Sequence, residues 1–187
     1  MATPSRKIGR AGSALNAMTR RRGPVIMASV KLQPFEPGLA AQIATWTTSA
    51  DEVNAWSSRF DDQVPPEVIV GWSRADDIEA YVGVVDATVI AYGELWLDPD
   101  EGEVELARLL LEPSRRGQGL GKELTRLLVA RARQAHPELP DVILRVRPDN
   151  TVARHAYVRA GFVELDAAEA KVWNEGQPAE YVWMRLP

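Results

Sequence analysis

The chain has 187 residues, of which 45% are hydrophobic and 26% are charged, a composition typical of one soluble globular domain with its own core. No apolar run approaches the roughly 18 residues that a membrane-spanning helix needs. The absence of cysteine excludes disulfides, thiolate metal sites and a cysteine acyl-enzyme. The two histidines, His136 and His155, form no metal motif, so no metal is expected.

Charge is unevenly distributed along the chain. Residues 1–31 hold seven bases and no acid; subtracting those seven from the 22 bases leaves 15 against 26 acids, a net charge of −11 for residues 32–187. We interpret residues 1–27 as a basic, disordered leader and residues 28–187 as a single domain. The leader lacks the apolar segment of a secretion signal, so the domain is expected to work in the cytoplasm.

The predicted elements begin with an alternating strand at 30–35. Helical spacing predicts a helix over 39–46, and the capping residues at 48–52 open a second helix that reaches Trp56. Residues 61–78 are predicted to be a loop around one short apolar run. Strands follow at 80–85, 89–97 and 103–111, then a helix at 119–135, a buried strand at 142–146, a helix from 150 to 160, and final strands at 162–165 and 181–186. This order favours a mixed sheet with helices on its faces, an α/β fold.

The most informative segment runs from Glu112 to Lys122 and contains a basic, glycine-rich turn between a buried strand and an amphipathic helix. Glycines let backbone N–H groups approach an anion closely, and the N-terminus of a helix attracts phosphate. The segment is not a Walker A loop, because no Ser or Thr follows Gly121-Lys122, and it lacks the third glycine of the dinucleotide-binding fingerprint. A turn whose glycines serve only the backbone is the alternative interpretation.

Two motifs in this region resemble those of the GCN5-related N-acetyltransferases (GNAT). The loop Arg116-Gly117-Gln118-Gly119-Leu120-Gly121 matches the family's Arg/Gln-x-x-Gly-x-Gly/Ala coenzyme A loop. The stretch 146–162, VRPDNTVARHAYVRAGF, is similar to the family's strand-then-helix segment with its Asn, Tyr and Gly-Phe. The resemblance covers residues 30–187 and is strongest over 103–165. It implies a mixed, mostly antiparallel sheet flanked by helices and splayed between strands 103–111 and 142–146.

The resemblance also implies where acetyl-CoA, the cosubstrate, would bind. The N–H groups of residues 116–121 would hold the pyrophosphate, and the basic side chains of Arg115, Arg116 and Lys122 add charge. Backbone groups of Leu109 and Leu111 would pair with the acetyl and pantetheine portions like an added strand. Asn150 would bond the pantetheine; its alternative role is that of a helix N-cap.

The implied catalytic residues are Tyr157, as the acid that protonates the departing thiolate, and Glu105, as the base that deprotonates the amine. Burial would raise the pKa of Glu105 and suit it to this role. In the alternative interpretation neither residue is catalytic: Tyr157 is a half-buried aromatic residue on a helix, and Glu105 is a solvated carboxylate on the face of a strand. Glu94 on the neighbouring strand is a second candidate for the base, and a chain of waters is a third possibility within the family.

The predicted function is therefore transfer of an acetyl group from acetyl-CoA to a primary amine by direct attack in a ternary complex, without a metal. The acceptor pocket is expected between the two early helices and the loop before Tyr181. Small-molecule and peptide amines both remain open as acceptors, and the family admits homodimers. One alternative is a non-catalytic acyl-CoA sensor on the same fold. The other is nucleic-acid binding through the basic leader, which the acidic body disfavours.

Overall fold

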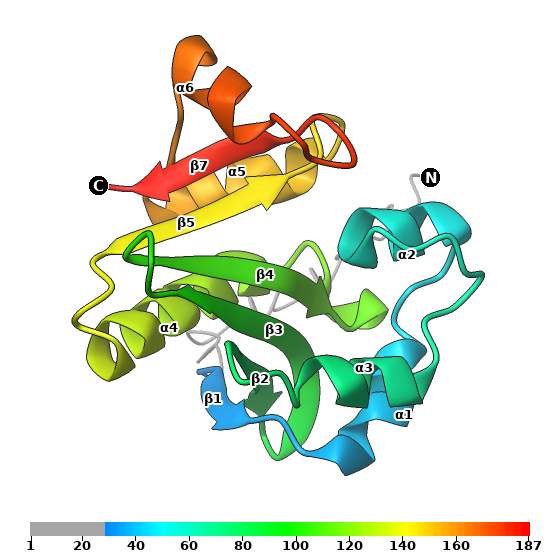
Figure 1. The fold of residues 1–187 in the computed structure, drawn as a ribbon. Coiled ribbons are helices and arrows are strands. Elements are labelled where there is room, and N and C mark those ends of the chain that lie inside the picture. The colour runs from blue at the N-terminus through cyan, green and yellow to red at the C-terminus, as the bar shows by residue number, and fades with distance from the viewer. Residues whose placement is uncertain (1–28) are drawn as a thin grey trace, which may run out of the picture.

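The computed structural model describes residues 29–187, so the basic leader predicted for residues 1–27 lies outside the described residues. Seven strands form one sheet in the order β1-β2-β3-β4-β5-β7-β6 (Figure 1). Every neighbouring pair is antiparallel except β4 and β5, which run parallel. The expected mixed, mostly antiparallel sheet is confirmed.

The strands are β1 (Lys31–Pro34), β2 (Ile78–Val85), β3 (Thr88–Asp98), β4 (Glu103–Leu111), β5 (Asp141–Val146), β6 (Val163–Glu164) and β7 (Val182–Leu186). The helices are α1 (Ala40–Ala44), α2 (Ala50–Ser57), α3 (Pro66–Trp72), α4 (Leu120–Ala135), α5 (Thr151–Ala160) and α6 (Ala167–Trp173). Short 3-10 turns, η1 (Pro37–Leu39) and η2 (Pro113–Arg115), precede α1 and α4. No helix within residues 29–187 has the length and apolar content to span a bilayer.

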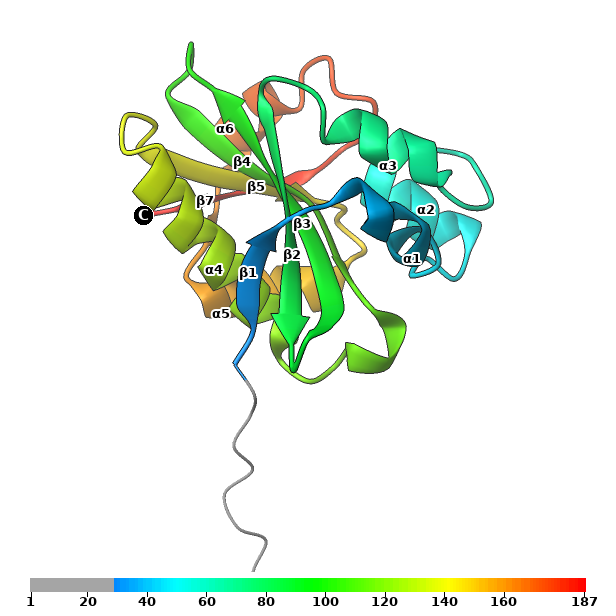
Figure 2. The ribbon, with the colours of Figure 1, turned by 90° about the horizontal axis from the view of Figure 1, so that it is seen from below.

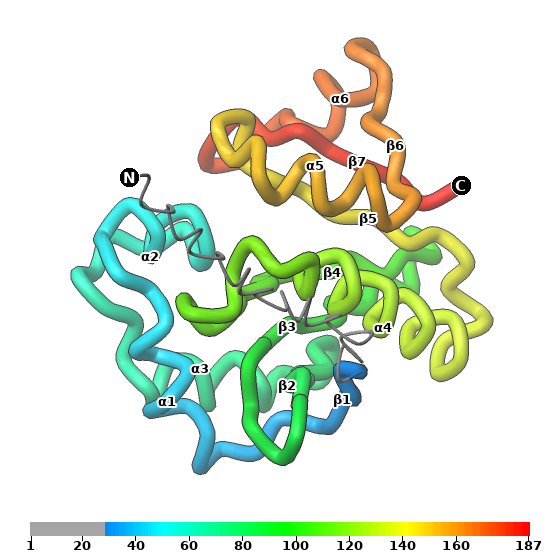
Figure 3. Tube along the Cα trace, turned by 180° about the vertical axis from the view of Figure 1, so that it is seen from behind, coloured from blue at the N-terminus to red at the C-terminus, as the bar shows by residue number. Residues whose placement is uncertain are grey.

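Helices cover both faces of the sheet. α4 and α5 lie against one face and enclose the largest core cluster with β3, β4 and β5, as the view from behind shows (Figure 3). α1, α2 and α3 cover the opposite face over β2 and β3, where they form a second cluster (Figure 2). α6 covers that same side at the other end of the sheet, over β5 and β7.

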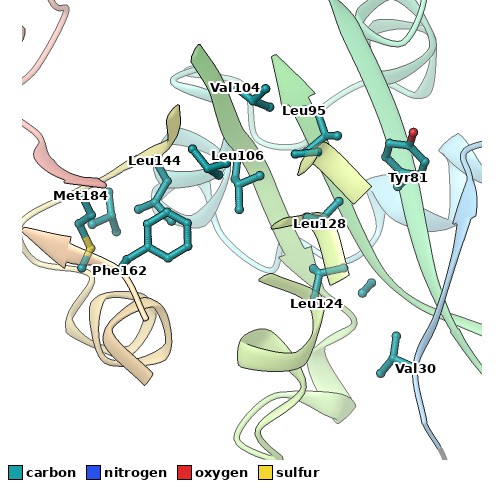
Figure 4. Packing of buried hydrophobic residues seen from close by; sticks show 14 of the residues in the cluster. Val30, Tyr81, Leu95, Val104, Leu106, Leu124, Leu128, Leu144, Phe162 and Met184 are labelled. Carbon is teal, nitrogen blue, oxygen red and sulfur yellow. The ribbon is translucent and has the colours of Figure 1, made fainter. Parts of the chain in front are cut away.

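The core between α4 and the sheet is built from the apolar stripe that the sequence predicts. Leu124 and Leu128 of α4 project toward Leu95 of β3 and Leu106 of β4, and all four are almost completely buried (Figure 4). Each such side chain contributes about 1.5–3 kcal/mol on burial. This packing fixes α4, and therefore the loop that precedes it, against the end of β4.

Two helices are absent from the sequence-based prediction. The predicted loop 61–78 contains α3, whose Ile69 is fully buried in the core cluster that it shares with the other early helices. α3 is hard to recognise in the sequence because it is short and rich in β-branched residues, although Pro66 in its first turn is typical of a helix start. α6 begins after Asp166, whose carboxylate accepts hydrogen bonds from the N–H groups of Ala168 and Glu169.

Candidate active site

A cleft of about 650 Å³ opens where β4 and β5 diverge. The two strands pair only at three positions, from Glu103 opposite Asp141 to Glu105 opposite Ile143. Beyond these pairs β4 continues along β3, and β5 stays paired with β7. The expected splay of the two central strands is therefore confirmed, and it leaves room for an extended molecule between them.

The glycine-rich loop and the first turn of α4 lie beside the cleft. Gly117 and Gly119 have φ values of 74° and 82°, a backbone region that favours glycine. The first hydrogen bond within α4 joins the N–H of Glu123 to the carbonyl of Gly119, so the N–H groups of residues 120–122 have no intrahelical partner. Among residues 29–187, no acceptor is found for the N–H groups of residues 117–119 either. This row of unpaired donors fits a phosphate group.

The arginine of this loop makes contacts that its sequence position does not reveal. Arg116 donates to the carboxylate of Glu52 at 2.6 Å, to the carbonyl of Trp46 at 2.6 Å and to the carbonyl of Leu111 at 3.2 Å. Its N–H group bonds to the carbonyl of Pro113. The side chain expected to add charge for a phosphate thus joins the loop to α2.

The predicted cofactor-binding residues are distributed around the cleft as follows. Arg116 and Gly121 of the loop line it, together with Leu109, Leu111 and Asn150. The loop residues that do not line it are Gly117, Gln118, Gly119, Leu120 and Lys122. Of these, Leu120 is directed into the core.

Asn150 and Tyr157 come from the two ends of one short helix. Asn150 caps α5, because its side-chain oxygen accepts from the N–H of Ala153 at 3.1 Å, which leaves its amide N–H₂ group for the cleft. Tyr157 packs edge-on against Phe162, and no hydrogen bond to its hydroxyl is found among the described residues. Burial raises the pKa of Tyr157 to about 12, so this phenol is protonated at neutral pH.

Glu105 lies at the point where β4 and β5 separate. It faces Trp96 of β3 in the register of the sheet, and its side chain is 14% exposed. Its carboxylate lies 3.1 Å from Nε of Arg145 on β5. Burial raises the pKa of Glu105 to about 7; the Arg145 guanidinium opposes this rise and the nearby Glu103 carboxylate adds to it. The group therefore exchanges a proton within the physiological range.

Aromatic rings surround the guanidinium of Arg145. Its central carbon lies 5.5 Å from the ring of Trp96, 5.2 Å from Tyr181 and 5.3 Å from Trp183. One guanidinium nitrogen also donates to the side chain of Gln177 at 2.9 Å. Sequence reasoning missed Arg145, although a charged residue inside an otherwise apolar strand is a recognisable signal.

Glu94, the second candidate for the base, has a different role. It is completely buried, and it accepts hydrogen bonds from the hydroxyl of Tyr92, the indole of Trp96 and the guanidinium of Arg108. It does not line the cleft. A carboxylate with three donors and no access to the cleft cannot take a proton from an acceptor amine.

A sequence model of the acetyltransferase (GNAT) family matches residues 41–162, well over half of the chain. The chain belongs to the GNAT family. This acetyltransferase therefore uses acetyl-CoA to acetylate amines, as its loop and second motif predicted.

Solved structures show the same fold. Aminoglycoside acetyltransferase AAC(6')-Ib, in complex with coenzyme A and kanamycin, is 22% identical with a TM-score of 0.66, over 84% of this chain and 94% of that one. Its complex with acetyl-CoA and paromomycin gives 21% identity and the same TM-score, over 84% and 93%. Spermidine N-acetyltransferase from Vibrio cholerae, with CoA and spermine, is 17% identical with a TM-score of 0.61, over 74% and 83%.

Proposed function

We propose that this acetyltransferase transfers the acetyl group directly from acetyl-CoA to a cationic primary amine, with Glu105 as base and Tyr157 as acid. The observation that carries the proposal is that both residues line one cleft, Glu105 from β4 and Tyr157 from α5, with pKa values suited to opposite tasks. A carboxyl with a pKa of about 7 is an effective base at neutral pH. A phenol that stays protonated is an effective acid.

The unpaired amides of residues 117–122 and the open edge of β4 support the choice of cofactor site. The loop amides would hold the pyrophosphate, and the backbone of Leu109 and Leu111 would pair with the acetyl and pantetheine portions. Asn150 would donate to the pantetheine through its free amide hydrogens. Acetyl-CoA supplies an activated acetyl group, so that a C–N bond forms while the C–S bond breaks.

The proton movements fall to the two titratable side chains. Glu105 takes a proton from the acceptor nitrogen, which frees the lone pair for attack. The N–H of Leu109 polarises the thioester carbonyl, because charge develops on its oxygen during the reaction. After the attack the nitrogen still carries one extra proton, which it loses to solvent as the tetrahedral intermediate collapses. Tyr157 gives its proton to the departing sulfur and recovers one from solvent. Charge and protons balance without a covalent acyl-enzyme.

The surroundings of Glu105 favour a cationic acceptor. A second cavity, of about 440 Å³, adjoins the cleft and shares Trp96, Glu105 and Arg145 with it. Its remaining charged lining residues are all acids: Asp77, Asp98, Glu101 and Glu103. The related structures contain kanamycin and spermine, which are cationic amines. A small molecule with several amino groups fits this charge better than a peptide does. We also propose that the reaction takes place in the cytoplasm.

The test is release of free CoA thiol by the purified protein with acetyl-CoA and a panel of amines. Aminoglycosides, polyamines, amino acids and peptides are compared at equal concentration. We expect release that depends on the acceptor and is greatest for polyamino compounds. Tyr157→Phe and Glu105→Gln should each lower kcat by about 100-fold or more.

Matched controls come from residues away from the cleft. Tyr81→Phe removes a half-buried hydroxyl between β2 and α4, and Glu138→Gln neutralises an exposed carboxylate; both should keep wild-type kcat. Tight binding of acetyl-CoA with no thiol release for any amine would contradict the proposed reaction. Equal rates for cationic and neutral amines would contradict the proposed acceptor class.

A further inference from the structure

A one-residue irregularity in β4 lies beside the proposed thioester site. Ala107 pairs with Glu94 of β3, whereas Leu110 pairs with Tyr92, so two residues of β4 oppose the single residue Gly93. This is a β-bulge, formed by Arg108 and Leu109. Arg108 has a φ of 48°, in the left-handed region that non-glycine residues rarely adopt. Such a conformation persists only where its surroundings hold it.

The bulge changes which face of the sheet each side chain meets. Before it, Val104 and Leu106 pack in the core beneath α4; after it, Leu109 and Leu111 do so. The alternation therefore slips by one position. As a result Arg108 lies on the other face, within reach of Glu94.

Contacts from three elements hold Arg108 in place. Its guanidinium donates to Glu94 of β3 at 2.7 Å, and Glu94 is completely buried. The guanidinium carbon lies 3.7 Å from the ring of Trp72 on α3 and 4.8 Å from that of Trp96. The indole of Trp56 on α2 donates to the backbone carbonyl of Arg108 at 2.7 Å.

The bond from Trp56 fixes the direction of a peptide group. In a planar trans peptide the carbonyl and the following N–H point in opposite directions. Anchoring the carbonyl of Arg108 on α2 therefore sets the direction of the N–H of Leu109. That N–H is the one that the proposed function assigns to the thioester oxygen.

We propose that Glu94, Arg108 and Trp56 form a clamp that orients the N–H of Leu109 toward the thioester carbonyl. The proposal rests on the proposed function. Glu94 and Trp56 are positioning residues: they act through the bulge and leave proton transfer to other groups. Because α2 also lines the cleft, the clamp connects the acceptor wall to the carbonyl-polarising amide.

The test uses Trp56→Phe, which keeps an aromatic ring and removes the donor, and Glu94→Gln, which keeps the shape and removes the charge. Trp46→Phe is the control: Trp46 is buried in the same helical layer, and no hydrogen bond from its indole is found among the described residues. The readouts are kcat, KM for acetyl-CoA, the Kd of CoA by calorimetry, and the infrared carbonyl band of bound acetyl-CoA labelled with ¹³C at the carbonyl.

We expect the wild-type protein to lower the frequency of the bound carbonyl band relative to free acetyl-CoA. In Trp56→Phe and Glu94→Gln the band should move back toward the free value, and kcat should fall by about 10- to 100-fold. KM and the Kd of CoA, which lacks the acetyl carbonyl, should stay within about twofold. Trp46→Phe should behave as wild type in all four measurements.

Two results would overturn the clamp alone: a wild-type band and kcat in both variants, or a loss of kcat matched by equal weakening of CoA binding with the band unchanged. Should Glu94→Gln fail to fold, Trp56→Phe decides between these outcomes. An unshifted wild-type band would instead refute the role of the Leu109 amide, and the clamp with it. Absence of wild-type turnover alongside a shifted band would refute only the proposed reaction.

Discussion

The pH dependence of acetyl transfer follows from the position of Glu105. The ordinary pKa of this carboxyl is 4.5, and burial raises it to about 7. The difference corresponds to about 3 kcal/mol against the charged form. A base must be ionised to act, and with a pKa of about 7 about one tenth of the protein carries the active carboxylate at pH 6 and about nine tenths at pH 8. The contribution of Glu105 to kcat/KM should therefore rise about tenfold between these values and level off above pH 8.

The acceptor also titrates, so its contribution has to be separated. The pH profile of kcat/KM is measured with the same amine for the wild type and for Glu105→Gln. In the variant, the remaining pH dependence comes from titration of the amine alone. The ratio of the two profiles then reports Glu105. Arg145→Met removes the positive charge 3.1 Å from the carboxylate. Because that charge lowers the pKa of Glu105, the midpoint of the variant should move to higher pH.

Two outcomes would refute this reasoning. The first is a ratio that stays flat between pH 6 and 8, which would mean that Glu105 titrates elsewhere or is not the base. The second is an Arg145→Met profile whose midpoint falls or stays in place, which would mean that the guanidinium does not act on Glu105 electrostatically. Thermal unfolding of each variant at pH 8 serves as the check that the fold is retained.

Three further predictions concern other parts of the site. Tyr157→Phe should lower kcat without lowering the Tm, since no partner of the hydroxyl is found among residues 29–187; a differential scanning experiment beside the kinetic assay checks both. Gly119→Ala should raise the Kd of CoA in calorimetry and cost about 1 kcal/mol in the free energy of unfolding, because alanine is strained at the φ of 82°; unchanged affinity would refute the phosphate role of the loop. Burial opposes ionisation of Glu52, but hydrogen bonds from Thr48 and Arg116 outweigh it and hold its pKa below 4.5. The stability from Glu52 is thus present above pH 4.5 and lost as the pH falls through the lowered pKa of the folded protein. The loss of Tm caused by Glu52→Gln should therefore shrink as the pH falls from 7 into the acid range; a loss that does not change with pH would contradict the ion pair.

Local signals in the sequence predicted much of this molecule. The loop 116–121 and the helix after it are defined by residues close together in the chain, and so is the cap of α5 by Asn150. The pairing of β2 with β3 and of β3 with β4 is local as well, because a short turn joins each pair. The positions of β5, β7 and β6 in the sheet have no such local signal. α6 is a local signal that was missed, since Asp166 and the alanines after it favour a helix start.

The partners within the site could not be predicted in the same way. Arg145 meets Glu105 across 40 positions of sequence, and Arg116 meets Glu52 across 64. Such pairs depend on which strands become neighbours and on the register between them. The bulge at Arg108 shifts that register by one residue. The alternation of apolar and polar residues along β4 therefore does not predict that Arg108 and Glu94 lie on the same face of the sheet.

The divergence of β4 and β5 gives this fold two unsatisfied edges in its interior. β4 offers backbone groups after Glu105 and β5 offers them after Ile143, and no strand within residues 29–187 lies between them. Exposed edges of this kind invite pairing with the strands of other molecules. A cosubstrate that fills the gap would also cap both edges, and at about 100 times its Kd it would stabilise the folded state by about 2.7 kcal/mol. Cellular acetyl-CoA would then protect the enzyme against aggregation as well as supply its acetyl group.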